Sequence, residues 1–491
     1  MGVVACRGRA FLVRWRPFYS LTLGAIDRGP ALSLRAREPG SDSGFVPLAP
    51  RAATLRLVWS KEVVSVDAVE ESAELVERVA ALDIGKASVM ACVRVPHPAK
   101  PGRRAQEVRE YLMLTSALLE LADWLRCERV SLVSMEATSD YWKPVYYLLE
   151  AEGFTCWLLN ARHVKTVPGR PKTDKLDAVW LAKVTERGMC APSLVHPKPI
   201  RQLRDLTRYR RSLIRERTRV KQRCEKLLED AQIKLSSVIS DLFGVSGRAM
   251  LEAMIAGQRN PRVLAQLARA SMRAKIEVLR EALTGHFDDH HALVARCMLN
   301  RIDALGADID ALTAQIQDLI APFTTQVTQL DEIPGVGVIG AQELVAELGV
   351  DMTRFATAAH LVSWAKFAPI DHKSAGKGKA ATTGKGNPWL AGTLGEIVAG
   401  LSRTNTFLGA RYRRLSKRRG KNRAIVAVGN SVLTIIWHLL SDPQARYQDL
   451  GANFYQSRLN IRHRQRDLIR QLEGLTGKKV TLQPRPQPTT V

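Results

Sequence analysis

Four carboxylates have the surroundings that metal chemistry requires. They are Asp83, Glu136, Asp174 and Asp177. Asp83 and Glu136 each follow a short apolar run, as expected at the end of a buried strand, where an acid is held rigidly and partly away from water. Asp174 and Asp177 are three residues apart, so on a helix they share one face. Clustered negative charge is unfavourable without cations, and hard divalent ions such as Mg²⁺ or Mn²⁺ prefer oxygen ligands.

A serine in a glycine- and lysine-rich segment forms a second candidate centre. Ser374 is flanked by Lys373, Gly376 and Lys377, within a stretch (371–388) that we expect to be a loop. A flexible backbone and neighbouring cations would allow its hydroxyl to attack a phosphate and form a covalent phosphoserine link. The alternative is a loop of this composition that only binds phosphate or solvent.

The charge balance indicates a polyanionic partner. The chain has 491 residues and a formal net charge of +25, with 73 Lys and Arg against 48 Asp and Glu. Nucleic acid is the default partner for such an excess, and a basic but inert surface is the alternative. The candidate nucleic-acid contacts are Lys172, Lys175, Arg208, Arg211, Arg215, Gly335, Gly337, Lys373, Lys377, Lys385, Arg413, Arg414, Lys417 and Arg418. Lys172 and Lys175 could equally serve only to balance the nearby acids.

The elements that must position the acids alternate between strands and helices over residues 76–197. We expect a strand hairpin (79–95), a helix (107–127), a strand ending at Glu136 (129–135), a helix (141–152), a strand (154–159) and a helix (174–183). This order predicts an α/β layer fold with the acids at strand ends.

Long charged helices are predicted for residues 198–328. The apolar residues Ile302, Leu305, Ile309, Leu312, Ile316 and Leu319 follow one another at intervals of three and four. That spacing predicts either a coiled coil or a single helix packed in a bundle. The nearby His and Asp residues of 285–291 indicate either a zinc site or, more simply, a helix end.

A third region (329–445) begins with a glycine turn. Ile333-Pro-Gly-Val-Gly337 precedes an apolar helix (341–348), the pattern of a helix-hairpin-helix turn whose backbone amides approach a phosphate. An ordinary Pro-Gly turn is the competing interpretation. We therefore predict a mainly α C-terminal domain.

The two ends of the chain differ in composition from the middle. Residues 1–75 form a basic extension that could be a disordered arm, a product of an upstream start codon or a segment resembling a transit peptide. Residues 446–491 form a polar tail. No apolar run approaches the roughly 20 residues that a membrane span needs, so we expect no membrane partner.

The motifs resemble a known family. Asp83-Ile-Gly-Lys, Glu136-Ala-Thr-Ser-Asp-Tyr-Trp and Lys172-Thr-Asp-Lys-Leu-Asp look like those of the DEDD-type insertion-sequence transposases, also called bridge-RNA-guided recombinases. Pro334-Gly-Val-Gly, Ser374-Ala-Gly-Lys and Gly384-Lys-Gly-Asn look like that family's C-terminal domain. The resemblance covers about residues 80–440, in the same order. The family's usual Gly before Tyr-Trp is replaced by Ser139-Asp140.

The resemblance implies a fold and a set of partners. It implies an RNase H-like domain similar to the RuvC junction resolvases, a coiled-coil linker and a helical domain that supplies a catalytic serine. By motif, Asp83, Glu136, Asp174 and Asp177 would bind Mg²⁺ or Mn²⁺, and Ser374 would join covalently to DNA. The partners would be double-stranded donor and target DNA, a structured guide RNA and further copies of the chain. Such a protein would act in the bacterial cytoplasm, associated with the nucleoid.

The sequence thus predicts a DNA transposase that breaks and rejoins phosphodiester bonds. One alternative is a junction-resolving nuclease that uses only the acids and water. Another is an inactive nucleic-acid-binding relic.

Overall fold

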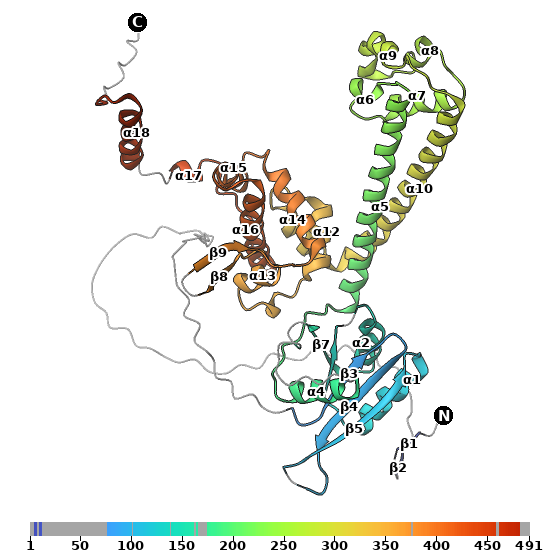
Figure 1. Ribbon diagram of the computed structural model, residues 1–491, viewed down its shortest axis with the longest axis vertical. Helices are drawn as coiled ribbons and strands as arrows, with labels where there is room; N and C mark the ends of the chain where they lie inside the picture. The colour runs from blue at the N-terminus through green and yellow to red at the C-terminus, as the bar shows by residue number, and fades with distance from the viewer. Residues whose placement is uncertain are drawn as a thin grey trace, which may run out of the picture. The chain divides into compact units, whose positions relative to one another are not determined.

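The computed structural model describes residues 4–6, 9–11, 76–100, 102–137, 139–161, 164, 174–374, 377–457 and 461–481. The chain divides into two compact units, Met1–Val195 and His196–Val491, which are described separately below (Figure 1). Most of the basic extension, Lys172 and the end of the polar tail lie outside the described residues. Near the N-terminus the structure places a short antiparallel pair, β1 (Val4–Cys6) and β2 (Arg9–Phe11).

A five-stranded mixed sheet forms the centre of the first unit. Its order is β5-β4-β3-β6-β7. The first three strands pair antiparallel, whereas β3, β6 and β7 run parallel. The strands are β3 (Val79–Ile84), β4 (Ser88–Pro96), β5 (Arg104–Leu112), β6 (Leu132–Glu136) and β7 (Thr155–Leu159). The expected hairpin is therefore confirmed, and it forms the middle of the sheet.

The helix expected over residues 107–127 was wrong in its first third. Residues up to Leu112 form β5, and the helix α1 (Thr115–Cys127) begins after it. The helical spacing had counted Leu112 and Leu114, yet both side chains are exposed, at 56% and 59%. Backbone pairing with β4 along nine residues outweighs the local pattern.

Helices cover both faces of this sheet. The helices α1 and α2 (Trp142–Ala151) pack on the face that carries Leu82 and Met135. The helix α4 (Asp174–Glu186) packs on the opposite face, over Ala81 and Cys92. The first unit is therefore an α/β layer structure, and α4 packs on the side of the candidate acids.

A long two-helix arm begins the second unit. The helix α5 (Lys198–Asp230) packs lengthwise on α10 (Asp289–Ile320), and short helices close the far end (Figure 1). His291 contacts Asp230, whereas Arg301 contacts Glu216, so the two helices run antiparallel. The short helices are α6 (Leu235–Val238), α7 (Val245–Ile255), α8 (Pro261–Ala265), η1 (Ala270–Lys275) and α9 (Ile276–Ala282).

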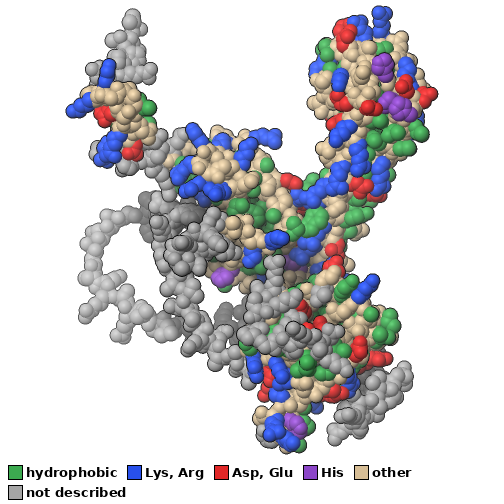
Figure 2. Space-filling view, viewed as in Figure 1, with side chains coloured by type: hydrophobic (Ala, Val, Ile, Leu, Met, Phe, Trp, Pro, Cys, Tyr) green, Lys and Arg blue, Asp and Glu red, His purple; other side chains and the backbone are tan. Residues whose placement is uncertain are grey.

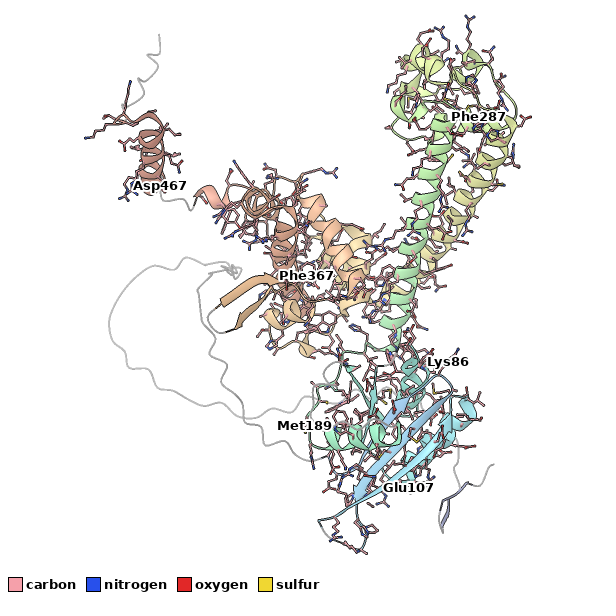
Figure 3. The ribbon with its side chains drawn as sticks, in the orientation of Figure 1. Lys86, Glu107, Met189, Phe287, Phe367 and Asp467 are labelled. Carbon is pink, nitrogen blue, oxygen red and sulfur yellow. The ribbon has the colours of Figure 1, made fainter. Side chains whose placement is uncertain are left out.

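The predicted apolar seam of α10 is used within the chain. Ile302, Leu305 and Ile309 are buried in the core that α10 shares with α5. The seam therefore forms an intramolecular hairpin of two helices. Phe287, labelled in Figure 3, packs into the same core at the start of α10.

The rest of the second unit is mainly helical. Its elements are η2 (Ala321–Phe323), α11 (Thr324–Asp331), α12 (Gly337–Leu348), η3 (Met352–Arg354), α13 (Ala358–Trp364), β8 (Ile370–Ser374), β9 (Lys377–Thr382), α14 (Pro388–Leu401), α15 (Phe407–Arg419), α16 (Lys421–Ser441), α17 (Phe454–Ser457) and α18 (Ile461–Thr476). The central helix is α16, which is long and apolar enough to cross a membrane. Val428, Val432 and Ile436 are nevertheless completely buried among the other helices, as in a core helix.

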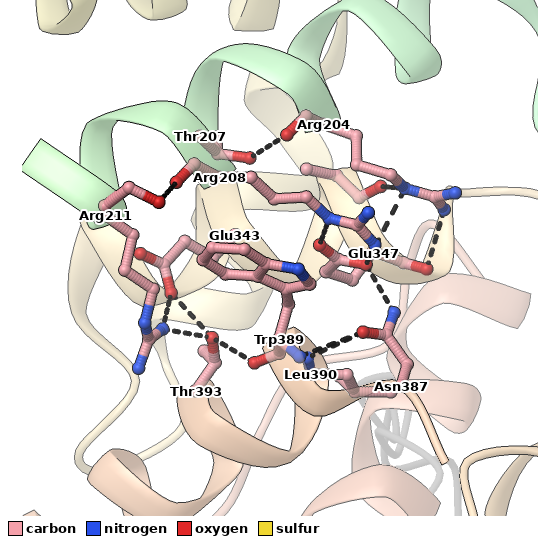
Figure 4. Close-up of polar contacts among 12 residues, drawn as sticks. Arg204, Thr207, Arg208, Arg211, Glu343, Glu347, Asn387, Trp389, Leu390 and Thr393 are labelled. Carbon is pink, nitrogen blue, oxygen red and sulfur yellow. Dashed lines mark hydrogen bonds and ion pairs between the residues drawn. The ribbon is translucent and has the colours of Figure 1, made fainter. Parts of the chain in front are cut away.

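A buried polar network joins the arm to the helices α12 and α14 (Figure 4). Arg211, on α5, donates to Glu343 at 2.5 Å and to Thr393 at 2.7 Å, and it also pairs with Glu396. One turn earlier, Arg208 makes two parallel hydrogen bonds to Glu347, at 2.7 and 2.8 Å. Bidentate pairing of this kind fixes geometry as well as charge, so the base of the arm is held in one orientation.

A buried histidine lies beside this network, at the start of α5. His196 is 4% exposed, and its Nε2 atom has no hydrogen-bond partner among the described groups. Burial, together with the nearby Arg204 and Arg354, lowers the pKa of His196 to about 3. The ring is therefore neutral in the folded protein at every pH at which the protein would normally be studied.

The depressed pKa of His196 predicts acid sensitivity. Between the unfolded pKa of about 6.5 and the folded value of about 3, only the unfolded chain binds the proton. Proton binding by the unfolded chain therefore lowers the free energy of unfolding as the pH falls below about 6.5. The expected loss is about 1.4 kcal/mol between pH 7.5 and pH 5.5. Urea unfolding at both values should show this loss in the wild type and a smaller one in His196→Gln. An equal loss in both proteins would exclude His196 as its source.

Candidate functional site

Two of the candidate acids lie at adjacent strand ends. The strands β3 and β6 are parallel, and Leu82 pairs with Met135. The next residues along each strand are Asp83 and Glu136, which therefore lie at the same level. Neighbouring strands are about 4.8 Å apart, a distance that lets both carboxylates approach one ion.

Both acids are on the sheet face that α4 covers. Side chains two residues apart on a strand point the same way. Ala81, two residues before Asp83, lies in the core beneath α4. Ser134, two residues before Glu136, accepts a hydrogen bond from Thr185 of α4 at 2.7 Å. The face opposite α1 and α2 therefore carries the acids.

The direction of α4 brings its own acids to the same edge. At its C-terminal end, Glu186 forms ion pairs with Arg94 at 2.7 Å and Arg104 at 2.9 Å. Arg94 pairs with Val79, the first residue of β3. The end of α4 thus lies at the start of β3, and its beginning, with Asp174 and Asp177, lies towards the end of β3.

The described acids have the chemistry that a divalent cation requires. Glu136 is 7% exposed, and Asp83 and Asp177 are partly buried. Asp174 is the first residue of α4, but its side chain lies outside the described part of the chain, as does that of Lys175. Partly buried carboxylate oxygens are suitable ligands for hard divalent cations, so the chemistry of these residues fits such an ion.

The loop after Glu136 contains a strained residue. Ser139 has a φ of 48°, in the left-handed region that glycine adopts without cost. The chain accepts this conformation two residues before Tyr141, at a cost of about 1 kcal/mol.

The second candidate centre is a hairpin and not the expected loop. Strands β8 and β9 pair antiparallel, and Ser374 pairs with Lys377 across the turn. Ser374 is the last residue of β8 and is therefore placed at the tip. The side chains of Lys373, Ser374 and Lys377 lie outside the described residues, so their contacts stay predictions.

Both ends of this hairpin are anchored. Before it, Phe367 (labelled in Figure 3) lies against Gly429 of α16, where an added Cβ would come within 2.5 Å of the ring. Asn430 donates to the Phe367 carbonyl at 3.3 Å. After it, Asn387 caps α14 by accepting from the Trp389 amide, and it donates to Glu347. The hairpin that carries Ser374 is therefore attached to the neighbouring helices both before β8 and after β9.

The glycine turn before α12 has backbone angles that favour glycine. It joins α11 to α12, and Gly335 and Gly337 have φ values of 85° and 62°. A Cβ at Gly335 would also lie 3.1 Å from the Ile397 carbonyl oxygen. The turn therefore requires glycine, although whether it contacts phosphate stays a prediction.

The candidate basic contacts divide into two groups. Arg208 and Arg211 form ion pairs with Glu347 and Glu343 at the base of the arm, and their role as nucleic-acid contacts stays a prediction. Arg413 donates to the carbonyls of Ser402 and Thr404, and Arg414 lies over the Tyr455 ring. The exposed candidates are Arg215, Lys385, Arg413, Arg414, Lys417 and Arg418. Figure 2 shows such cations gathered over α15.

The histidine pair at the start of α10 has a structural explanation. His290, His291 and Asp230 have potential ligand atoms within 4.8 Å of one another. However, Nδ1 of His291 accepts a hydrogen bond from the Asp288 amide, as part of a capping box. Its proton is therefore on Nε2, which faces Asp230 at 3.4 Å. This tautomer supports the helix-end interpretation.

Comparisons with known proteins match both units. A family model for DEDD transposases of IS110 type, described as "Transposase", matches residues 80–233. A second, described as "Transposase IS116/IS110/IS902 family", matches residues 327–413. The "Transposase for insertion sequence element IS1111A" of Coxiella burnetii (strain RSA 493 / Nine Mile phase I) is 25% identical over 326 residues, covering 64% of this chain and 78% of that protein.

These matches define the class as a DEDD transposase. The chain belongs to the IS116/IS110/IS902 family of transposases, and the recognised resemblance is confirmed. Membership implies DNA binding and DNA transposition. The DEDD transposase family usually implies a divalent metal.

The Ser134–Thr185 hydrogen bond should set the position of α4. Both residues are 0% exposed. In Thr185→Val the Ser134 hydroxyl loses this donor and keeps only a 3.4 Å contact to the Ala80 carbonyl. We expect a loss of about 1–3 kcal/mol in urea unfolding.

The double variant Ser134→Ala/Thr185→Val is the matched control. Because it removes both partners, it should lose less than the sum of the two single variants. Strictly additive losses would show that the hydroxyls do not act as a pair.

Proposed function

We propose that this transposase breaks and rejoins DNA to move an insertion sequence, with four acids holding Mg²⁺ or Mn²⁺ and Ser374 as the nucleophile. The acids are Asp83, Glu136, Asp174 and Asp177. The single observation that carries the proposal is the register of β3 and β6, which sets Asp83 level with Glu136 on the face that α4 covers. The order and pairing of the strands support an RNase H-like fold of the kind found in RuvC resolvases.

The acids would act through position and charge. When bound, the cation supplies positive charge at the phosphate oxygens, where negative charge grows during the reaction. Asp83 and Glu136 are carried by central strands and so change position little. Asp174 and Asp177 are carried by α4, whose far end is tied by Thr185 and Glu186. Rigid support of this kind keeps reacting groups close to the productive geometry.

Ser374 would carry out a phosphate exchange without net hydrolysis. Its Oγ forms a bond to phosphorus while one bridging P–O bond of the DNA breaks, and the serine proton passes to the released DNA hydroxyl. The oxygen of a second DNA hydroxyl then attacks the phosphorus, the bond between phosphorus and Ser374 Oγ breaks, and the proton of that hydroxyl passes to Oγ. The number of phosphodiester bonds is unchanged, so no nucleotide hydrolysis is needed.

The partners follow from the family resemblance and the charge. We propose double-stranded donor and target DNA, selection by a structured guide RNA and a homo-oligomer. Oligomer assembly on DNA would bring acids and serine to one phosphodiester. Exposed cations support nucleic-acid contacts at Lys385, Lys417 and Arg418. Lys172, Lys175, Lys373 and Lys377 are proposed by sequence alone.

Recombination should require both centres. Supercoiled donor plasmid, target DNA and the element's RNA, with Mg²⁺, should yield recombinants that are counted by sequencing the junctions. Asp83→Ala and Ser374→Ala should each reduce the yield by roughly a thousandfold or more, as expected for loss of an essential group. Ser363→Ala, at another exposed serine of the same unit, is the control and should retain activity. Unchanged activity in either test variant refutes the role given to that residue.

A covalent intermediate separates the proposal from its rivals. Denaturing gels with labelled DNA should show a protein–DNA adduct for the wild type and none for Ser374→Ala. Free cut ends that persist in Ser374→Ala would instead indicate a nuclease that uses only the acids and water. Salt-sensitive binding without any Mg²⁺-dependent product would indicate a relic.

A further inference from the structure

The arm helix α5 has one apolar face and one basic face. Leu213, Val220 and Leu228 are buried against α10 and the short helices. Residues on a helix advance by about 100° each, so positions 215, 219 and 226 fall on the side opposite this core. On this outer side of α5, the side chains of Arg215, Arg219 and Lys226 are exposed.

Six cations occupy that outer side in a single line. They are Arg204, Arg208, Arg211, Arg215, Arg219 and Lys226. The intervals are four, three, four, four and seven residues, and the position skipped in the last interval holds the uncharged Gln222. None of these seven positions, Gln222 included, holds Asp or Glu.

The first three cations of this line have different surroundings from the last three. Arg204, Arg208 and Arg211 pair with Glu343, Glu347 and Glu396 of α12 and α14. Arg215, Arg219 and Lys226 are exposed, and within the described part of the chain no ion pair engages them. Along α5, Figure 2 shows Lys and Arg side chains at the surface.

An aromatic ring lies between the first three cations and the last three. The Trp389 ring is partly buried, with the guanidinium carbons of Arg208 and Arg215 at 5.7 and 5.4 Å from its centroid. Cations beside a partly open indole form the combination that binds a nucleotide through its phosphate and its base.

We propose that Arg215, Arg219 and Lys226, with Trp389 at their base, bind the sugar–phosphate backbone of a nucleic-acid strand along the arm. The three cations, called here the arm strip, span about 16 Å at 1.5 Å per residue. Phosphates of one strand recur about every 3.4 Å along a duplex axis, so the strip faces about five of them. The inference rests on the proposed function only in taking nucleic acid as the partner.

Fluorescence anisotropy on the full-length protein tests the arm strip. The variant Arg215→Gln/Arg219→Gln/Lys226→Gln removes the strip, and Arg262→Gln/Arg269→Gln/Arg273→Gln removes three exposed cations from the tip of the same arm. Binding of a labelled stem-loop RNA and of a labelled DNA duplex is measured from 50 to 300 mM salt, without divalent metal, in an Asp83→Ala background. That background makes the readout independent of strand cleavage.

The strip variant should lower the slope of log Kd against log salt by about 2 to 3, because about three phosphate contacts are lost. The tip variant should leave the slope within error of the parent. A change for RNA alone, for DNA alone or for both supports the strip and identifies its ligand. Equal changes in the two variants, or none in the strip variant, would overturn the proposal. Absence of recombinants with the unmodified protein, together with the expected slope change in the strip variant, would count against the proposed function and not against the strip.

Discussion

The arrangement of the first unit depends on how α4 is fixed against the sheet. The helix is a separate element, and a small slide along the strands would separate its acids from those of β3 and β6. Apolar contacts alone are weakly directional. In contrast, Thr185 donates to Ser134 of β6, and Glu186 pairs with Arg94 of β4 and Arg104 of β5. These buried polar contacts lie at the far end of α4, where they specify its position without entering the site.

In the second unit, buried polar contacts also fix the position of helices relative to one another. Glu343 and Glu347 are anchored by arginines of α5, and Glu347 also receives a hydrogen bond from Asn387. A buried ion pair contributes little net stability once desolvation is counted, but removing one partner is costly, so such pairs favour one arrangement over others. Through Asn387, the arm is connected to the start of α14 and hence to the chain that follows the Ser374 hairpin.

The basic residues show why a count of charge does not locate a binding surface. Arg208, Arg211 and Arg215 come from one segment and have the same chemistry. Arg208 and Arg211 pair with Glu347 and Glu343 at the base of the arm, whereas Arg215 is exposed. The difference is set by which acids lie opposite each side chain, and those acids are more than a hundred residues away in the sequence.

Local sequence patterns were sufficient for much of this protein. Apolar runs ending in Asp83 and Glu136 predicted strand ends, and the spacing of Asp174 and Asp177 predicted one helix face, because these signals depend on near neighbours. The β5 strand, the hairpin of Ser374 and the pairing of the α10 seam with α5 were decided only by the tertiary structure. Strand pairing and helix packing depend on distant partners, which here override the local preference of residues 107–112 and 371–382. The sequence by itself therefore determined which groups are available for chemistry, and the tertiary structure decided which of them share an edge and which cations remain exposed.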